Sequence, residues 1–411
     1  MSREVASRRR LLEKGVSMKQ MLLLAISLAL LSRADAADIT QGHWHAGLLK
    51  HFRREIPTRR GPPLDWQGKV PLIITNNCDS KIWPGIATQA GIGPGTGGFE
   101  LEAGTNKTLW VAPDWQGRVW GRTNCTVNGN SCACKTGDCS SKLNCEFSGA
   151  PPATLAEFNL AGGVEGMQTF YDISLVDGYN LPIGINHIAS RNTTYIPPNL
   201  TNCACIATAG WLYEPALTGT FYANASFPVP LEPHETNERA RSWCPWPNLA
   251  FPPTKPGDGI YPYPDDKVRR PIFAPCKSTC AATGSDRDCC IGRYHDPNIC
   301  KPSLYSLAVK SLCPDAYSFA FDDQRSTFIV PKGGGWEIVM CPAGRSTNIL
   351  RQLGQELFEL ASGGRLSDLS MRRLRNVTYI EASRGAVGAL QPQRCIMTLA
   401  LAAVAGGWLM L

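Results

Sequence analysis

The chain has 411 residues, of which 43% are hydrophobic and 18% charged, with 17 cysteines and a formal net charge of +7. This composition supplies a core and excludes wholesale disorder, while 39 glycines and 31 prolines favour short strands and loops over long helices. The basic excess lies near the two ends, and residues 70–344 carry a net charge of −4. We therefore expect no nucleic-acid partner.

The first 36 residues resemble a secretory signal. The apolar run at 21–31 follows several basic residues and precedes Ala34-Asp35-Ala36, a small-x-small cleavage pattern. The run is too short to span a bilayer, although an uncleaved anchor is the alternative. Residues 37–69 form a short basic arm. The sequence thus predicts a secreted, extracellular protein.

Secretion determines how the cysteines and sequons are interpreted. In an oxidising compartment the cysteines form disulfides, so we expect neither a metal site nor a cofactor. Sixteen lie between Cys78 and Cys341, and Cys395 belongs to the C-terminal tail. Sequon asparagines predict surface glycans, except that Cys125 disfavours the sequon at Asn124. The five expected sites are Asn106, Asn192, Asn199, Asn224 and Asn376.

From residue 70 onward the pattern predicts short strands, at 70–75, 81–83, 107–111 and 118–122. Two further strands carry a carboxylate in an apolar pattern. Glu157 shares one face of strand 154–160, and Asp172 shares one face of strand 170–176. Such a residue either points to solvent or lines a cleft. The pattern alone favours solvent.

Residues 206–275 hold 13 prolines and a single cysteine, Cys244, which predicts a long irregular insertion. We expect most of its aromatic side chains to be buried against the body, and a sugar-stacking platform is the alternative. These aromatics are Trp211, Tyr213, Tyr222, Trp243, Trp246, Tyr261 and Tyr263.

The C-terminal region combines a helix with an expected processing signal. Apolar residues in 346–362 have helical spacing, and a basic stalk is expected to continue to residue 385. Small residues, a polar spacer and the apolar run 396–411 then predict a glycosylphosphatidylinositol (GPI) signal, with residues 386–411 removed. A tail anchor and an exposed C-terminal helix are the alternatives.

Four motifs in order carry a family resemblance. They are residues 134–139 (CKTGDC), 151–158 (PPATLAEF), 171–182 (YDISLVDGYNLP) and 312–318 (LCPDAYS), with Cys341-Pro342 at the end. Together they resemble the thaumatin-like, pathogenesis-related family over about residues 71–343. The resemblance implies a mainly β fold in residues 70–344. This fold is an antiparallel β-sandwich with disulfide-rich loops, little helix and an acidic cleft.

The resemblance also implies a disulfide pattern. Carried onto this chain, the pairs are Cys78–Cys341, Cys125–Cys134, Cys139–Cys145, Cys205–Cys313, Cys244–Cys276, Cys280–Cys289 and Cys290–Cys300. Cys132 and Cys203 are left over. The family pairs the equivalent of Cys203 with a cysteine before the last strand, where residues 328–331 hold none. We therefore expect a rewired Cys132–Cys203 bond.

The family's cleft is lined by one arginine, one glutamate and three aspartates. Glu157, Asp172 and Asp315 match this set, whereas Ala150 occupies the arginine position and Thr169 that of the first aspartate. The resemblance therefore implies a cleft with three carboxylates and no cation. Mutual repulsion would then raise the pKa of one carboxyl group.

Three functions are compatible with these residues. The first is a monomeric surface protein, held to the membrane by a lipid anchor, that binds cell-wall polysaccharide, specifically β-1,3-glucan, in the cleft. The second is a weak endo-β-1,3-glucanase with Glu157 as general acid and Asp172 or Asp315 as base or nucleophile. The third is an antifungal protein-interaction module. The sequence contains no GxSxG, HExxH or phosphate-loop motif.

Overall fold

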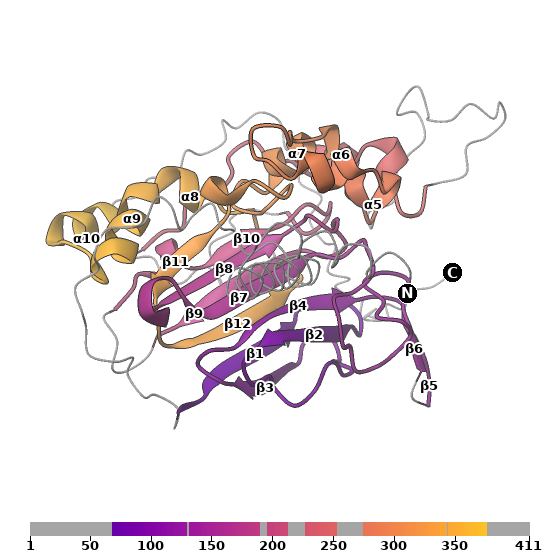
Figure 1. The fold of residues 1–411 in the computed structure, drawn as a ribbon, viewed down its shortest axis with the longest axis horizontal. Helices are drawn as coiled ribbons and strands as arrows, with labels where there is room; N and C mark the ends of the chain where they lie inside the picture. The colour runs from indigo at the N-terminus through magenta and orange to yellow at the C-terminus, as the bar shows by residue number, and fades with distance from the viewer. Residues whose placement is uncertain are drawn as a thin grey trace, which may run out of the picture. The chain divides into compact units, whose positions relative to one another are not determined.

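A computed structural model describes residues 68–129, 131–189, 195–212, 227–252, 274–342 and 344–375. All of these residues belong to one compact unit, Met1–Tyr379. The expected signal, basic arm and C-terminal tail lie outside the described residues. Two five-stranded sheets and a two-stranded hairpin form the strand framework (Figure 1).

The first sheet combines both ends of the described chain. Its order is β10 (Cys203–Cys205), β9 (Ile183–Ile188), β12 (Gly335–Met340), β1 (Val70–Asn76) and β3 (Asn106–Val111). β1 runs parallel to β12, and the other neighbours are antiparallel. A bond between Cys78 and Cys341 joins the ends of β1 and β12.

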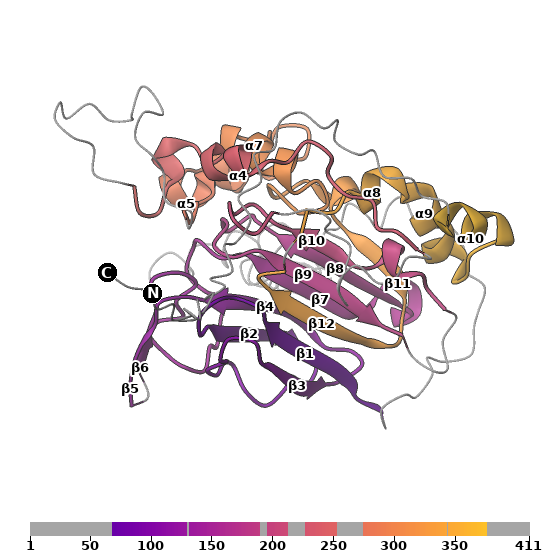
Figure 2. The same cartoon turned by 180° about the vertical axis from the view of Figure 1, so that it is seen from behind.

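The second sheet is antiparallel throughout. Its order is β11 (Phe328–Pro331), β8 (Gln168–Ser174), β7 (Leu155–Gly162), β4 (Gln116–Arg122) and β2 (Trp83–Ala90). The separate hairpin consists of β5 (Thr126–Asn128) and β6 (Ser131–Ala133). Figure 2 shows the same strands from behind.

The two sheets share one core, which makes the fold a β-sandwich. Trp336 of the first sheet contacts Phe158 and Tyr171 of the second, with ring centroids 5.4 and 4.4 Å apart. All three rings are buried. Burial of such large apolar side chains is the main stabilising term of the sandwich. The predicted mainly β fold is confirmed.

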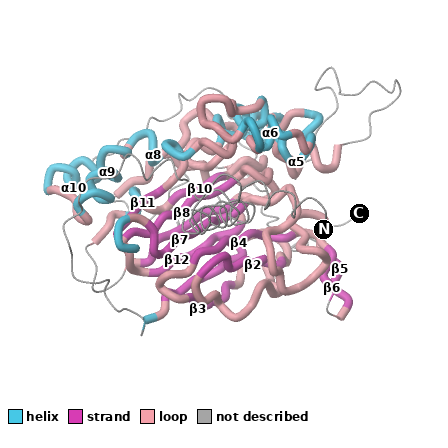
Figure 3. The backbone as a smooth tube through the Cα atoms, viewed as in Figure 1, coloured by secondary structure: helices cyan, strands magenta, loops and turns pink. Residues whose placement is uncertain are grey.

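Helices are short and lie outside the strand layers (Figure 3). The disulfide-rich loop region holds α4 (Asn237–Ser242), α5 (Thr279–Thr283), α6 (Asp286–Cys289) and α7 (Leu304–Leu312). Single 3₁₀ turns are η2 (Val164–Gly166), η3 (Pro198–Leu200), η5 (Trp246–Asn248), η6 (Gly292–Tyr294) and η7 (Asp323–Arg325). Within the described residues, no helix has the length and apolarity needed to cross a membrane.

Three C-terminal helices follow the last strand: α8 (Ile349–Gln352), α9 (Gly354–Gly363) and α10 (Asp368–Arg375). α9 packs against β11, and Gln168 of β8 donates a hydrogen bond to Ala361 O (2.9 Å). Leu360 and Leu374 are fully buried in the main core. The helix expected in 346–362 is therefore present. The part of the expected stalk that reaches Arg375 is a folded, packed element.

The described residues of the segment 206–275, where the sequence predicts an insertion, are packed against the body. Trp246 is buried, and Trp211 and Trp243 are partly buried against the core. Trp243 also donates to Ala207 O (2.9 Å) and meets Tyr179 edge-on. These three tryptophans fit the expected burial. The four tyrosines of the insertion named above lie outside the described residues.

All seven disulfides implied by the resemblance are present. The expected Cys132–Cys203 bond is wrong, because both cysteines are free and buried in different elements, β6 and β10. A loop-rich region with this many bridges gains roughly 2–4 kcal/mol from each in the chain-entropy picture.

One glycosylation prediction is also wrong. Asn199 is fully buried, and its Nδ2 donates to Pro228 O and to Leu374 O of α10. A glycan on this nitrogen is incompatible with the folded arrangement. Asn106 is exposed at the start of β3, as the prediction requires. Asn192, Asn224 and Asn376 lie outside the described residues.

Candidate functional site: an acidic cluster on the second sheet

Glu157 and Asp172 are directly opposite each other on neighbouring strands. The antiparallel register of β7 and β8 pairs Glu157 with Asp172, and its next pair is Phe158 with Tyr171. Phe158 and Tyr171 point into the core, so the two carboxylates share the opposite face of the sheet. The structure therefore brings these two predicted site residues together.

Arg118 supplies the cation that the sequence comparison missed. On β4 it lies opposite Glu157 in the register, and its Nε is 3.1 Å from Glu157 Oε1. Both side chains are mostly buried, with exposed fractions of 16% and 15%. The expectation of a site without a cation, based on Ala150, is therefore wrong. The strand 118–122, which carries Arg118, was predicted from the sequence. The sequence does not reveal which residue of the neighbouring strand Arg118 faces.

Asp172 is the most deeply buried member of this group. It is 4% exposed, and its Oδ1 has no hydrogen-bond partner within the described structure. Burial raises the pKa of Asp172 well above its usual range, and the adjacent Glu157 raises it further, while Arg118 opposes the rise. The interpretation that these carboxylates point to solvent is wrong. Burial therefore favours the protonated form of Asp172, which could donate a hydrogen bond.

Asp177 is a fourth member that sequence reasoning missed. It lies in the turn after β8, five residues beyond Asp172, where strand alternation gives no signal. Burial raises the pKa of Asp177 to about 6, and Glu157 adds to the rise. We call Arg118, Glu157, Asp172 and Asp177 the acidic cluster. It combines one ion pair with two carboxyl groups that hold protons more tightly than usual.

The segment around Tyr317 lies against this cluster. Tyr317 N donates to Ile173 O (2.8 Å) and Leu175 N donates to Tyr317 O (2.9 Å), so the segment runs beside β8. The Tyr317 hydroxyl donates to Asp323 Oδ1 (2.9 Å). Asp323 in turn contributes to the raised pKa of Asp172. The loop thus adds a further carboxylate and a hydroxyl near the cluster.

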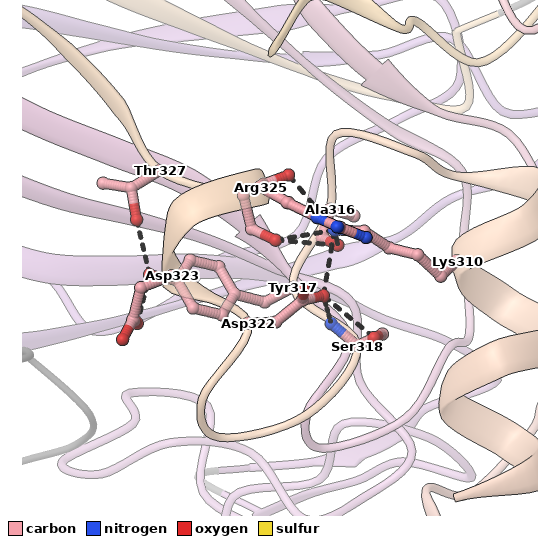
Figure 4. Close-up of polar contacts among 9 residues, drawn as sticks. Lys310, Ala316, Tyr317, Ser318, Asp322, Asp323, Arg325 and Thr327 are labelled. Carbon is pink, nitrogen blue, oxygen red and sulfur yellow. Dashed lines mark hydrogen bonds and ion pairs between the residues drawn. The ribbon is translucent and has the colours of Figure 1, made fainter. Parts of the chain in front are cut away.

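A second polar network stabilises the same segment (Figure 4). Lys310 Nζ lies 2.9 Å from Asp322 Oδ2 and donates to Ala316 O, Arg325 O and Ser326 Oγ. Asp322 Oδ2 also accepts from the backbone and hydroxyl of Ser318. Lys310 therefore joins the end of α7 to the loop that carries Asp323.

Asp315 is directed away from the acidic cluster. Its Oδ2 accepts from Ile349 N (2.8 Å) and its Oδ1 from Leu350 N (2.9 Å), at the start of α8. Burial raises the pKa of Asp315, and these hydrogen bonds oppose the rise. Both oxygens are thus used to hold the C-terminal helices. The structure brings two of the three predicted site residues together, and Asp315 is not with them.

One set of side chains has the spacing of metal ligands. The sulfur atoms of Cys125, Cys132 and Cys134 lie within 4.8 Å of one another. Two of these atoms are bonded to each other, and a disulfide sulfur is not the thiolate that binds metals. In this oxidation state the set supplies only one thiol. No metal or cofactor is needed to explain the acidic cluster.

Comparisons with known proteins support the fold. Residues 76–342 match the model of the Thaumatin family. The chain is 35% identical over 280 residues to "Thaumatin-like protein 1" of Arabidopsis thaliana, covering 66% of this chain and 86% of the relative. It is 34% identical over 275 residues to "Pathogenesis-related protein 5" of Arabidopsis thaliana, covering 66% and 90%.

Among solved structures, the chain is similar to a thaumatin-like xylanase inhibitor. The two are 33% identical, the match covers 28% of this chain and 74% of that one, and the TM-score is 0.24. The family match ends before α8, so the C-terminal helices lie beyond it.

Proposed function

The chain belongs to the thaumatin family, and from this premise we propose that it is a secreted, defence-related protein that binds a cell-wall polysaccharide at the acidic cluster. The names of its relatives include pathogenesis-related proteins. The proposed ligand is a β-1,3-glucan. The observation that carries the proposal is the partly exposed Arg118–Glu157 ion pair, with the buried Asp172 directly opposite Glu157 in the strand register.

The chemistry of the cluster suits sugar hydroxyls. Glu157 accepts hydrogen bonds, Arg118 donates them, and Asp172 in its neutral form can do either. A hydroxyl is both donor and acceptor, so neighbouring hydroxyls of one sugar ring match such a mixed set. Hydrogen bonds to charged groups contribute about 1.5–3 kcal/mol each, enough to make a single ion-paired carboxylate important for retention.

Retention on insoluble β-1,3-glucan tests the proposal. The wild-type protein should sediment with the glucan, and Glu157→Gln should weaken binding about tenfold, equivalent to about 1.4 kcal/mol. Glu146→Gln is the matched control, because Glu146 is an exposed acid paired with Lys142 outside the cluster. Equal retention of the wild type and Glu157→Gln would contradict the assignment of the site. Equal sedimentation with and without glucan would contradict the ligand.

A weak endo-β-1,3-glucanase is the second candidate, and the pKa of Asp177 favours it. A carboxyl group with a pKa of about 6 can act as general acid near neutral pH, with Glu157 as the second carboxyl group of the pair. This reverses the role first expected for Glu157. Pure protein should then release reducing ends from laminarin, with a rate that falls above about pH 6. The release should be lost in Asp177→Asn.

A protein-interaction module is the remaining alternative. It predicts antifungal activity that is unchanged by Glu157→Gln.

We also propose that the mature protein is a monomer carrying a GPI anchor near residue 385. The test is release from intact cells by phosphatidylinositol-specific phospholipase C. A protein that stays on the cells after this treatment would contradict the anchor but leave the glucan proposal intact.

A further inference from the structure

Three sulfur atoms lie at the base of the β5–β6 hairpin. Cys125 and Cys134 are bonded to each other, and Cys132 is a free thiol with no exposed surface. The Cys132 sulfur is 3.7 Å from the Cys134 sulfur, and all three sulfurs lie within 4.8 Å of one another. A thiol is therefore in van der Waals contact with a disulfide.

The backbone holds this arrangement in place. Cys132 lies in β6 and Cys134 directly follows this strand, and their sulfur atoms are 3.7 Å apart. Cys132 N donates to Ser141 O (2.7 Å), and Cys134 N donates to Asp138 Oδ1 (2.8 Å). Both cysteines are thus fixed to the same loop. The contact between their sulfurs does not depend on the exposed tip of the hairpin.

We propose that Cys125, Cys132 and Cys134 form a thiol–disulfide exchange site. The Cys132 side chain turns until its sulfur is in line with the Cys125–Cys134 bond, and the thiolate then attacks the Cys134 sulfur, so that a Cys132–Cys134 bond forms and the Cys125–Cys134 bond breaks. Cys125 leaves as a thiolate and takes up the proton that Cys132 lost. The number of disulfides is unchanged, so the step needs no oxidant or reductant. It transfers the free thiol from a fully buried position to Cys125, which is half-buried.

Burial and the neighbouring charges together determine how readily the Cys132 thiol ionises. The buried Arg122 guanidinium favours the thiolate, whereas Asp138 and Glu100 oppose it. Burial is the largest effect and raises the pKa of the Cys132 thiol. Exchange should therefore be slow at neutral pH and faster in mildly alkaline solution, because the thiolate is the attacking species.

Cys203 provides an internal control. It is also a free, fully buried thiol, but it lies in β10 of the main core. Within the described part of the chain, no group of three close sulfur atoms includes Cys203. Cys203 also lies two residues from a disulfide-bonded cysteine, Cys205, but in the described structure only Cys132 has both sulfurs of a disulfide within 4.8 Å.

The test is labelling of the native, glycosylated protein with iodoacetamide at pH 7 and pH 8. The protein is then denatured without reduction, its remaining thiols are labelled with N-ethylmaleimide, and its peptides are mapped. The native label should appear on Cys125, together with a Cys132–Cys134 bond. Its rate should rise about tenfold between the two pH values, as the thiolate fraction does below the pKa. Cys203 should carry only the second label.

Two variants complete the design. Cys132→Ser should abolish native labelling of Cys125 and leave the Cys125–Cys134 bond intact, whereas Cys203→Ser should leave the labelling unchanged. Thermal unfolding confirms that each variant is folded. A single Cys125–Cys134 linkage with Cys125 unlabelled at pH 8 would overturn the proposal. So would native label on Cys132 with that linkage intact, or labelling of Cys125 that persists in Cys132→Ser.

Discussion

Asp172 and Asp322 are two buried carboxylates on either side of the segment around Tyr317, and their surroundings differ. Asp322 meets Lys310, and Ser318 donates to it twice. Asp172 faces Glu157, and one of its oxygens has no hydrogen-bond partner in the described structure. Buried polar atoms are nearly always paired, and Asp172 Oδ1 is one of eight buried side-chain atoms in the described structure that depart from this rule.

The comparison separates a charge whose partners lie within the protein from one whose partners do not. The Lys310–Asp322 network satisfies its charges within the protein and so positions the loop. The acidic cluster leaves one buried carboxyl oxygen, Asp172 Oδ1, without a hydrogen-bond partner in the described structure. Burial alone does not distinguish the two, because both aspartates are less than a tenth exposed.

Replacing Lys310, the cation of the Lys310–Asp322 network, should have the largest effect on the free energy of unfolding. Lys310→Met leaves Asp322 buried without its counter-ion and removes the donor to three further oxygens. The free energy of unfolding should fall by about 3 kcal/mol, as for other broken buried pairs. Urea unfolding at pH 7 measures it. A loss below about 1 kcal/mol would show that solvent already screens the pair.

A smaller loss is expected at Asp315. Asp315→Ala removes the acceptor of two buried backbone N–H groups at the start of α8 and should cost about 2 kcal/mol. Glucan retention should be unchanged, because Asp315 is not part of the acidic cluster. Asp315→Asn, which keeps one oxygen, should lose less. Loss of glucan retention in a folded Asp315→Asn variant would show that Asp315 contributes to glucan binding.

Asp172→Asn should change the pH dependence of stability more than stability itself. The pKa of Asp172 is raised in the folded state, so its favourable contribution is complete below the ordinary value of 3.8 and is lost as pH rises. Relative to the asparagine variant, the wild type should lose stability from pH 4 upward, by at most about 1.4 kcal/mol per pH unit. Urea unfolding between pH 4 and 7 measures the difference. Parallel stability curves would contradict a neutral Asp172.

The smallest effect is expected at an exposed ion pair. Lys142 and Glu146 are 2.8 Å apart on the surface, with exposed fractions of 54% and 62%. Lys142→Ala should change the free energy of unfolding by less than about 0.5 kcal/mol. A larger loss in the same urea series would mean that removing a charged group destabilises the protein whether or not the group is buried.

The alternation of apolar residues separated Glu157 and Asp172 from the core face of their strands but wrongly favoured solvent for them, and family motifs predicted seven disulfides. Alternation does not reveal which strands are neighbours. Arg118 was therefore missed although its strand was predicted, and Asp177 was missed because a turn has no alternation. The hydrogen bonds that occupy Asp315 come from the start of α8, 34 residues further along the chain. The predictions of a glycan on Asn199 and of a Cys132–Cys203 bond were wrong for the same reason. The surroundings of both residues are formed by segments whose position the local sequence does not reveal.

The hydrogen bond from Asn199 to Leu374 also has a consequence for biosynthesis. The two residues are 175 positions apart, so the sequon leaves the ribosome well before the segment that covers it. At about 5–20 residues per second, that interval is roughly 10–35 s. During this time Asn199 has no α10 above it, and a glycan added then would prevent the last helix from docking. In a chain that enters the secretory pathway, as we propose for this one, the order of synthesis would place glycan addition and docking of the last helix in kinetic competition for one side chain.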